Sequence, residues 1–445
     1  MDIVFSLLII FITLIICILK NIYIFYPLLF GLSILILLAL KRGYKIKKIL
    51  TMLLKGALKT NQIYILLILI GVSTAIWMSS GTISAFIFYG IKIINPNLFI
   101  ISVFFITLVV SFIIGSSFGT VGTIGIVFIT LAKASNINLD LIAGAIITAA
   151  YIGERISPLS SSANLIAILT ETNLYINLKR MSLSTVVPFI MTVSIYVILS
   201  IKNPLSIKSL NISTELQNSF NLNLMVLIPA LIILIFVIFK IDVRIALLVS
   251  IMIACVESLL LQSRSFGEIV HFIIFGFEMN SHNNISNILH GGGILPMLKT
   301  ILIVIISSCY AGIFEGTKML KDFETILEIT SQKFGTFFSM ILASIAGCFI
   351  GCSQTFAIVT AHQLMSKIYI KRNIKKSDLA LDIGNTALII APLVPWNIAS
   401  TFPALILSVG AGYIPYAFFL YFVPLFGLIK VIDLNYKKYV LDTKN

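Results

Sequence analysis

The amino-acid sequence predicts an all-α, polytopic membrane protein of about 10–12 helices, arranged as two structural repeats with broken or re-entrant helices. Its composition excludes an ordinary soluble globule: 59% of the 445 residues are hydrophobic, 11% are charged and the mean hydropathy is +1.09. A helix needs about 20 apolar residues to cross the hydrocarbon core, and longer uncharged stretches can hold two crossings. Asp, Glu, Lys and Arg are absent from residues 60–91, 93–132, 181–201, 216–239, 334–361 and 383–429.

The net charge of +14 does not indicate a nucleic-acid partner, because the basic residues cluster between apolar segments. Seven of them lie between Lys41 and Lys59. Short basic loops are typical of the cytoplasmic side of membrane proteins, so we predict that this loop is cytoplasmic. Residues 3–19 and 22–40 then form a pair of membrane helices, and the first lacks the basic start and cleavage site of a removable signal peptide.

The chain is predicted to comprise a first transmembrane repeat at residues 1–201, a polar linker at 202–221 and a second transmembrane repeat at 222–445, which ends in a short tail. Glycine and proline landmarks recur in both halves at matched spacing: Gly81, Gly115 and Pro158 are separated by 34 and 43 residues, and Gly316, Gly351 and Pro392 by 35 and 41. Interrupted hydrophobic segments at corresponding positions of two halves indicate a secondary transporter whose binding site lies at the interruptions, near the bilayer midplane.

The first interruption is the stretch GSSFGTVGTIG at residues 115–125, which holds four glycines and four hydroxyl side chains within an uncharged segment. Non-helical backbone at membrane depth is tolerated only where protein or a water-filled cavity satisfies its polar groups. We therefore expect an unwound site whose carbonyls act with the hydroxyls of Ser116, Ser117, Thr120 and Thr123 as hard oxygen ligands for a small cation. The alternative is that the small residues serve close helix packing.

The second interruption in this half is GERISPLSSSANLIA at residues 153–167. An ionisable residue within the membrane is costly to bury, so its presence there indicates a function. A carboxylate at such a position can exchange a proton for a cation. We predict that Glu154 is such a carboxylate, unless it and Arg155 mark a helix end at the interface. Adjacent residues on a helix diverge, so these two need not pair with each other. The polar residues predicted to line the site beside Glu154 are Ser157, Ser160, Ser161 and Asn164.

The second half offers a corresponding set of polar residues. In GCSQT, at residues 351–355, Ser353 and Gln354 can supply side-chain oxygens, although plain helix packing explains this stretch equally well. Asp382 is the predicted counterpart of Glu154, with Asn385 next to it. Asn397 ends the stretch APLVPWN, whose two prolines exclude a regular helix.

These motifs together resemble the NhaC-type sodium:proton antiporter family, within the broader ion-transporter superfamily. The similar stretches include AIWMSSGTI (75–83), GSSFGTVGTIGI (115–126), GAIITAAYIGERISPLSSSANL (144–165), HGGGILPMLKT (290–300), AGIFEG (311–316), GCSQTFAIV (351–359) and APLVPWN (391–397). The resemblance implies a two-repeat fold with broken helices and cation-coupled exchange. The sequence departs from the family pattern at three positions: Ser161 stands where relatives tend to have an acid, Glu154 replaces a more usual Asp, and Ala391 replaces a common Ser.

We therefore predict a Na⁺/H⁺ antiporter of the bacterial cytoplasmic membrane, with Na⁺ and H⁺ as the transported or coupling ions and no other cofactor. Its partners are the lipid bilayer and small solutes, and the fold is compatible with a homodimer. The alternative is a Na⁺- or H⁺-coupled exchanger or symporter of a small carboxylate or amino acid. A passive channel is more remote, because the asymmetric breaks do not form symmetric rings of ligands. An enzyme or ATP-driven pump is not indicated, since neither H-E-x-x-H nor a phosphate-binding loop occurs.

Overall fold

The computed structural model describes residues 25–58, 61–93, 95–135, 137–205, 210–239, 241–279, 289–317 and 321–429, with a few positions between 6 and 23. This part of the chain is helical and contains no β-strand beyond an isolated bridge between Phe277 and Gly291. The all-α prediction is confirmed. The helices of the first part are α2 (Phe25–Lys41), α3 (Ile46–Leu58), α4 (Asn61–Ser79), α5 (Thr82–Ile93), α6 (Phe99–Ile114), α7 (Ser117–Thr120), α8 (Ile126–Ala134), α9 (Leu139–Ile156), α10 (Ser161–Thr170), α11 (Leu174–Ser184), α12 (Val186–Lys202) and α13 (Leu210–Ser219).

The second part of the chain is also helical. Its helices are α14 (Ile228–Ile238), α15 (Val243–Leu260), α16 (Phe266–Phe275), α17 (Ile294–Thr317), α18 (Lys321–Phe334), α19 (Thr336–Gly351), α20 (Gln354–Lys371), α21 (Lys376–Asn385), α22 (Ala387–Ile390) and α23 (Ile398–Ile406). Within the predicted linker, residues 210–219 form α13, whereas residues 206–209 lie outside the described chain, as does the C-terminal tail beyond residue 429.

Many of the apolar helices are interrupted, as the sequence predicts for a transporter. Among the described residues, four helices are long and apolar enough to cross a membrane, and the number rises to seven if each of three bent helix pairs counts as one span. Six further apolar helices have 10–17 residues. One bent pair joins Lys376–Leu393 to Ile398–Ile406 at 50° across the second-half break. The chain is therefore a multi-pass helical membrane protein with broken helices.

Helix α9 lies in the interior of the molecule, and its residues 141–155 are all buried. It begins at Asn138, whose side-chain oxygen accepts hydrogen bonds from the backbone amides of Asp140 and Leu141. The Ser111 hydroxyl of α6 donates to the Ala150 carbonyl at 2.5 Å. A Cβ at Gly153 would collide with Ser111, so the small residues of α9 allow α6 to approach closely.

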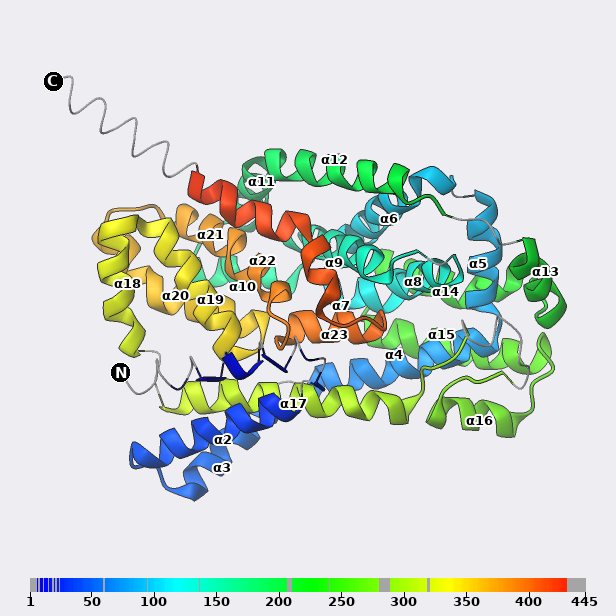
Figure 1. The fold of residues 1–445 in the computed structure, drawn as a ribbon, viewed down its shortest axis with the longest axis horizontal. Helices are drawn as coiled ribbons and strands as arrows, with labels where there is room; N and C mark the ends of the chain where they lie inside the picture. Colours follow the sequence, from blue (N-terminus) through cyan, green and yellow to red (C-terminus); the bar gives the residue numbers. More distant parts are fainter. Residues whose placement is uncertain are drawn as a thin grey trace.

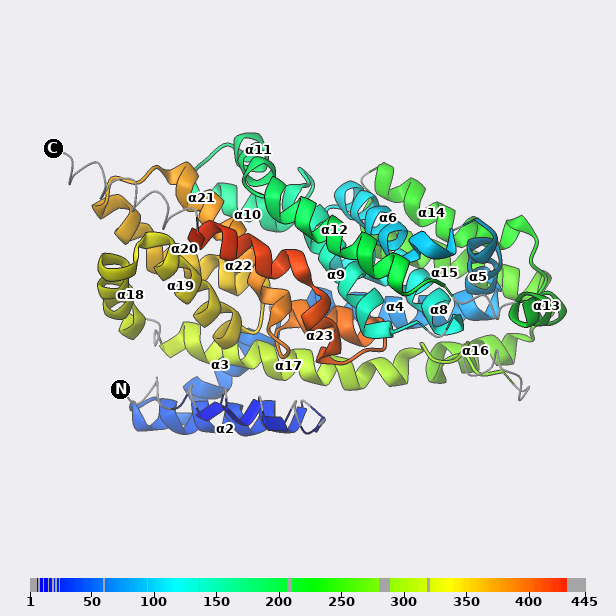
Figure 2. The same ribbon diagram turned by 45° about the horizontal axis from the view of Figure 1, so that its top comes forward.

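The remaining helices surround α9 in an elongated body (Figure 1). The long helix α17 runs along one side, and α2 and α3 lie beyond it, outside the main body (Figure 1). Helix α12 crosses the other side over α9, and the view turned by 45° shows α23 between α17 and α9 (Figure 2). The breaks of both halves consequently meet in the middle of the molecule.

Candidate ion-binding site

The first helix break involves fewer residues than the sequence predicts. Helix α6 ends at Gly115 with φ 70° and ψ 17°, Ser116 is extended, and α7 begins at Ser117. The rest of the stretch is helical, with a π-helical turn at Val121–Gly125 that leads into α8. The expectation of unwound backbone throughout residues 115–125 is therefore wrong.

Three hydroxyl groups of this stretch form hydrogen bonds within the stretch itself. The Ser116 side chain accepts a hydrogen bond from the Gly119 amide at 3.2 Å and so caps α7. Thr120 and Thr123 donate back to the carbonyls of Ser116 and Gly119, both at 2.8 Å. These hydroxyls are engaged by their own helix, and the break supplies only a short turn followed by a new helix start.

The two breaks of the first half touch each other at Gly115. A Cβ there would lie 2.7 Å from the Leu159 carbonyl carbon and 2.9 Å from the Ser160 nitrogen. Only glycine combines the left-handed turn with this close approach of backbone to backbone. The glycine thereby places the start of α7 beside the turn that connects α9 to α10.

The second half repeats the turn at a position shifted by one from that expected. Helix α19 ends at Cys352 with φ 47° and ψ 19°, Ser353 is extended, and α20 begins at Gln354. Cys352 rather than Gly351 is thus the structural counterpart of Gly115. The Ile398 amide donates to the Cys352 carbonyl at 2.8 Å, which ties this break to the start of α23.

Glu154 lies where both halves meet and is 5% exposed. One carboxylate oxygen accepts from the Ser117 backbone amide at 3.1 Å. The other accepts from the Ser162 hydroxyl at 2.6 Å and from the Gln354 side-chain amide at 3.5 Å. The N-terminal ends of α7, α10 and α20 therefore converge on the Glu154 carboxylate. The three groups that donate hydrogen bonds to it are electrically neutral.

Arg155 is fully buried next to Glu154 but faces other partners. Its guanidinium donates to the carbonyls of Gly384 at 3.0 Å and Met181 at 3.1 Å, to the Thr185 hydroxyl at 3.3 Å, and to the Asn385 side-chain oxygen. These acceptors are all neutral, so Arg155 fastens α9 to α11 and α21 without neutralising Glu154. Asn385, predicted as a site residue, contacts this arginine.

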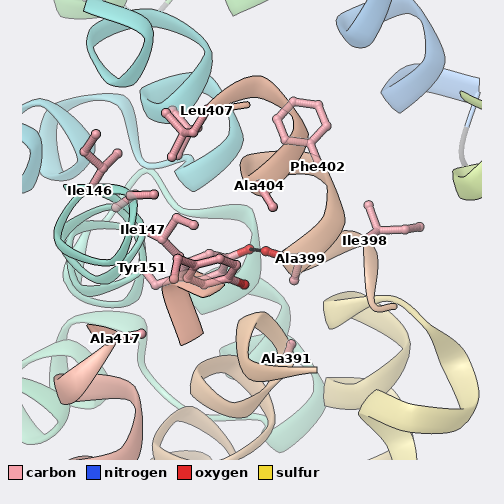
Figure 3. Close-up of a cluster of buried hydrophobic side chains, with 14 of the residues drawn as sticks. Ile146, Ile147, Tyr151, Ala391, Ile398, Ala399, Phe402, Ala404, Leu407 and Ala417 are labelled. Atoms are coloured by element: carbon pink, nitrogen blue, oxygen red, sulfur yellow. Dashed lines mark hydrogen bonds between the residues drawn. The ribbon is translucent and has the colours of Figure 1, made fainter. Parts of the chain in front are cut away.

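A third contact between the halves lies one turn before Glu154. The Tyr151 hydroxyl donates to the Ala399 carbonyl at 2.7 Å, within an apolar cluster that includes Ile147 and Phe402 (Figure 3). Asn397 caps α23 by accepting from the Ala399 amide at 2.9 Å, and its amide donates to the Cys348 carbonyl at 2.8 Å. Asn397 thus holds the second-half break together.

The polar residues predicted between 157 and 164 divide into separate roles. Ser157 and Ser160 accept from the backbone amides of Leu159 and Ala163, and the Asn164 amide donates to the carbonyls of Pro158 and Ser160. These contacts stabilise the turn itself. The side chain of Ser161 is exposed. The serine that reaches Glu154 is Ser162. It is not among the predicted site residues, because a run of three serines does not show which one faces inward.

Asp382 does not occupy the position that corresponds to Glu154. It lies ten residues before Pro392, whereas Glu154 lies four before Pro158. The Tyr369 hydroxyl donates to its carboxylate at 2.5 Å. Asp382 and Asn385 line a separate polar cavity of about 680 Å³, whose wall also includes Arg180, Arg372 and Asp378.

Comparison with known proteins identifies the family of the chain. The model of the Na⁺/H⁺ antiporter family matches residues 2–163 and 149–432. The chain belongs to the Na⁺/H⁺ antiporter family. The antiporter is therefore a secondary transporter, and the resemblance seen in its sequence motifs is confirmed.

Curated relatives of the antiporter cover most of its length. It is 27% identical over 397 residues to an uncharacterised Na⁺/H⁺ antiporter of Haemophilus influenzae, which covers 85% of this chain and 84% of that protein. The Na⁺/H⁺ antiporter NhaC of Alkalihalophilus pseudofirmus is 28% identical over 379 residues, or 82% and 81% of the two chains. The malate-2H⁺/Na⁺-lactate antiporter of Bacillus subtilis is 25% identical over 390 residues, or 85% and 83%.

Proposed function

We propose that the antiporter exchanges Na⁺ for H⁺ across the bacterial cytoplasmic membrane, and that the Glu154 carboxylate holds either ion in turn. The observation that carries the proposal is the environment of Glu154, which is buried among neutral donors from both halves. A carboxylate in an ion pair with an arginine is already neutralised and could not bind a proton and a cation in turn. Arg155 directs its donors elsewhere, so Glu154 can be neutralised by a proton or by a cation.

The surrounding oxygens suit a small hard cation. The Ser162 hydroxyl and the Gln354 amide both approach the same carboxylate oxygen, and rotation of that amide would present its own oxygen. Together with the carboxylate, these groups form an oxygen-rich ligand set of the kind that Na⁺ prefers. Protonation of Glu154 would remove the negative charge that makes cation binding favourable, so the two ions compete for one site.

The unequal hydrogen bonds indicate how access could alternate between the two sides. Glu154 is held at 2.6 Å by Ser162 of its own half, but at 3.5 Å by Gln354 of the other half. The longer contact is the weaker one, so we expect Glu154 to move with α9 and α10 while Gln354 moves with α20. Relative movement of the repeats around this carboxylate would open the site to each side in turn.

A second candidate is coupled exchange of a small carboxylate, the activity in the name of the Bacillus subtilis relative. The start of α20 favours it, because the Ser353 side chain does not cap this helix. A helix start of this kind attracts an anionic group. Under this alternative, Na⁺ or H⁺ at Glu154 would drive the movement of a carboxylate bound near Gln354.

The experiment that tests the proposal uses everted membrane vesicles in which respiration builds a pH gradient. Addition of Na⁺ should dissipate the gradient in vesicles with the native chain and fail to do so with Glu154→Gln, which cannot carry a proton or a negative charge. Glu171→Gln serves as the matched control, because Glu171 is exposed and pairs with Lys376. Comparable protein levels in the vesicles establish that the variants are inserted.

The result for Glu154→Gln separates the candidates. If this variant dissipates the gradient as the native chain does, Glu154 does not carry the coupling ion and the proposal is wrong. Proteoliposomes loaded with Na⁺, malate, lactate or an amino acid, with and without an imposed pH gradient, then identify the cargo. Uptake of a carboxylate that depends on Na⁺ would favour the second candidate over simple Na⁺/H⁺ exchange.

A further inference from the structure

Helix α3 lies outside the main body against the end of α17 that carries Gly312 and Glu315 (Figure 1). It is fixed there by backbone contact. A Cβ at Gly56 would collide with the Ser308 carbonyl of α17, and the Tyr44 hydroxyl donates to the Thr317 carbonyl at 3.3 Å. The helix is therefore held in place, and its remaining surface has a defined orientation.

The surface of α3 comprises three different faces. Ile49, Met52 and Gly56 are buried and face α17. A second face carries apolar residues that recur every four positions and are 53–68% exposed: Ile46, Leu50, Leu54 and Leu58. Such an apolar stripe on a basic amphipathic helix is typical of helices that lie in the membrane interface.

The third face of α3 is basic and borders a cavity of about 790 Å³. Lys47, Lys48 and Lys55 line this cavity together with Lys45 just before the helix, and the side chains of all four are exposed. Glu315 of α17 is the one acidic residue in the lining, so four ammonium groups face a single carboxylate. Thr51 also lines the cavity, and its hydroxyl group donates to the Lys47 carbonyl of its own helix at 2.9 Å.

We propose that this cavity binds the headgroup of an anionic phospholipid, whose acyl chains lie along the apolar stripe of α3. The positive charge of the lining favours a phosphate-bearing anion. A phospholipid can contact both faces of α3 at once, with its headgroup at the lysines and its acyl chains on the apolar stripe. A soluble anion would use the lysines but make no contact with Ile46, Leu50 and Leu54. The basic loop that contains α3 is predicted to be cytoplasmic, where anionic lipids attract such residues.

The test is native mass spectrometry of the full-length protein in mixed micelles that contain equal amounts of phosphatidylglycerol and phosphatidylcholine. The native chain should retain phosphatidylglycerol in preference. The triple variant Lys47→Gln/Lys48→Gln/Lys55→Gln should lose about 100-fold of that preference, since each basic residue near an anionic lipid contributes about fivefold. The triple variant Lys47→Arg/Lys48→Arg/Lys55→Arg keeps the charges and should keep the preference.

A matched control removes the same charge from exposed lysines elsewhere. Lys179→Gln/Lys202→Gln/Lys299→Gln should retain the native preference, and size-exclusion chromatography verifies that each variant is folded. If the native chain retains phosphatidylglycerol and phosphatidylcholine equally, the proposal is wrong, whatever the variants show. Displacement of phosphatidylglycerol by potassium phosphate, but not by potassium chloride of the same ionic strength, would overturn it in favour of a soluble anion. Both readouts are independent of ion exchange.

Discussion

Gly115 and Cys352 form the same left-handed turn at the two breaks, with φ and ψ of 70° and 17° at the glycine and 47° and 19° at the cysteine. An extended serine and a new helix start follow each of them. An L-residue in this conformation costs about 1–2 kcal/mol, which glycine avoids. The first break therefore forms without this strain, whereas the second accommodates it at a buried cysteine.

The difference predicts that alanine is tolerated much less well at position 115 than at position 352. Gly115→Ala should lower the free energy of unfolding by about 2–4 kcal/mol, because the new Cβ meets the backbone of Leu159 and Ser160 in a left-handed conformation. Cys352→Ala should have a smaller effect, since a Cβ is already present and the hydrogen bonds from the thiol to the Phe349 and Ile350 carbonyls are long, at 3.6 and 4.0 Å. Thermal denaturation followed by fluorescence-detected size exclusion measures both. Equal melting temperatures for Gly115→Ala and the native chain would contradict this account of the break.

Two neighbouring serines provide a sharper test of the site. Ser162→Ala removes a 2.6 Å hydrogen bond to the Glu154 carboxylate and a proposed cation ligand, so we expect the rate of Na⁺/H⁺ exchange at limiting Na⁺ to fall about tenfold. Ser161→Ala, at an exposed position, should remain within about twofold of the native rate. Initial rates of Na⁺-dependent proton movement in proteoliposomes give both values. A larger loss for Ser161→Ala would instead place the functional serine where the sequence pattern first suggested.

The fold and the location of the breaks were predictable from the sequence, because uncharged stretches, glycines and prolines are visible without any long-range information. Glu154 stood out as an acid in an apolar segment. The register of the second break was not predictable, since cysteine is not a signal for a left-handed turn. Nor could the sequence show that Arg155 reaches Gly384 and Asn385, 229 and 230 positions away. Such contacts depend on how the two halves of the chain pack against each other.

Arg155 provides a prediction about stability. Lysine has one ammonium group and cannot reproduce the planar fork that serves the Gly384 and Met181 carbonyls together. Arg155→Lys leaves buried acceptors without donors and should destabilise the protein by about 3–5 kcal/mol, with a lower melting temperature. Arg180→Lys, at a partly exposed ion pair with Asp378, should change stability by less than about 1 kcal/mol. Similar melting temperatures for the two variants would show that Arg155 is not a structural anchor.

Substitution of Asp382 tests whether a second carboxylate takes part in coupling Na⁺ to H⁺. It lines the polar cavity beside Arg180 and Arg372. Four of the six residues at 371–376, where its helix begins, are basic, which predicts that this end of the helix is cytoplasmic. Asn385 lines the same cavity and accepts a hydrogen bond from Arg155, so one residue of the cavity wall contacts α9. We propose that Asp382 carries a second proton in each exchange cycle, in addition to the one carried by Glu154.

If Asp382 carries a proton in each cycle, Asp382→Asn should lower the number of protons exchanged per Na⁺. Tyr369→Phe removes the hydrogen bond to Asp382 but leaves the carboxylate, so it should slow exchange without altering this ratio. The ratio is obtained in proteoliposomes from the combination of Na⁺ and pH gradients at which net flux is zero, a condition that depends on stoichiometry and not on rate. An unchanged null point for Asp382→Asn, with exchange still measurable, would mean that this carboxylate lies beside the pathway and that Glu154 alone couples the two ions.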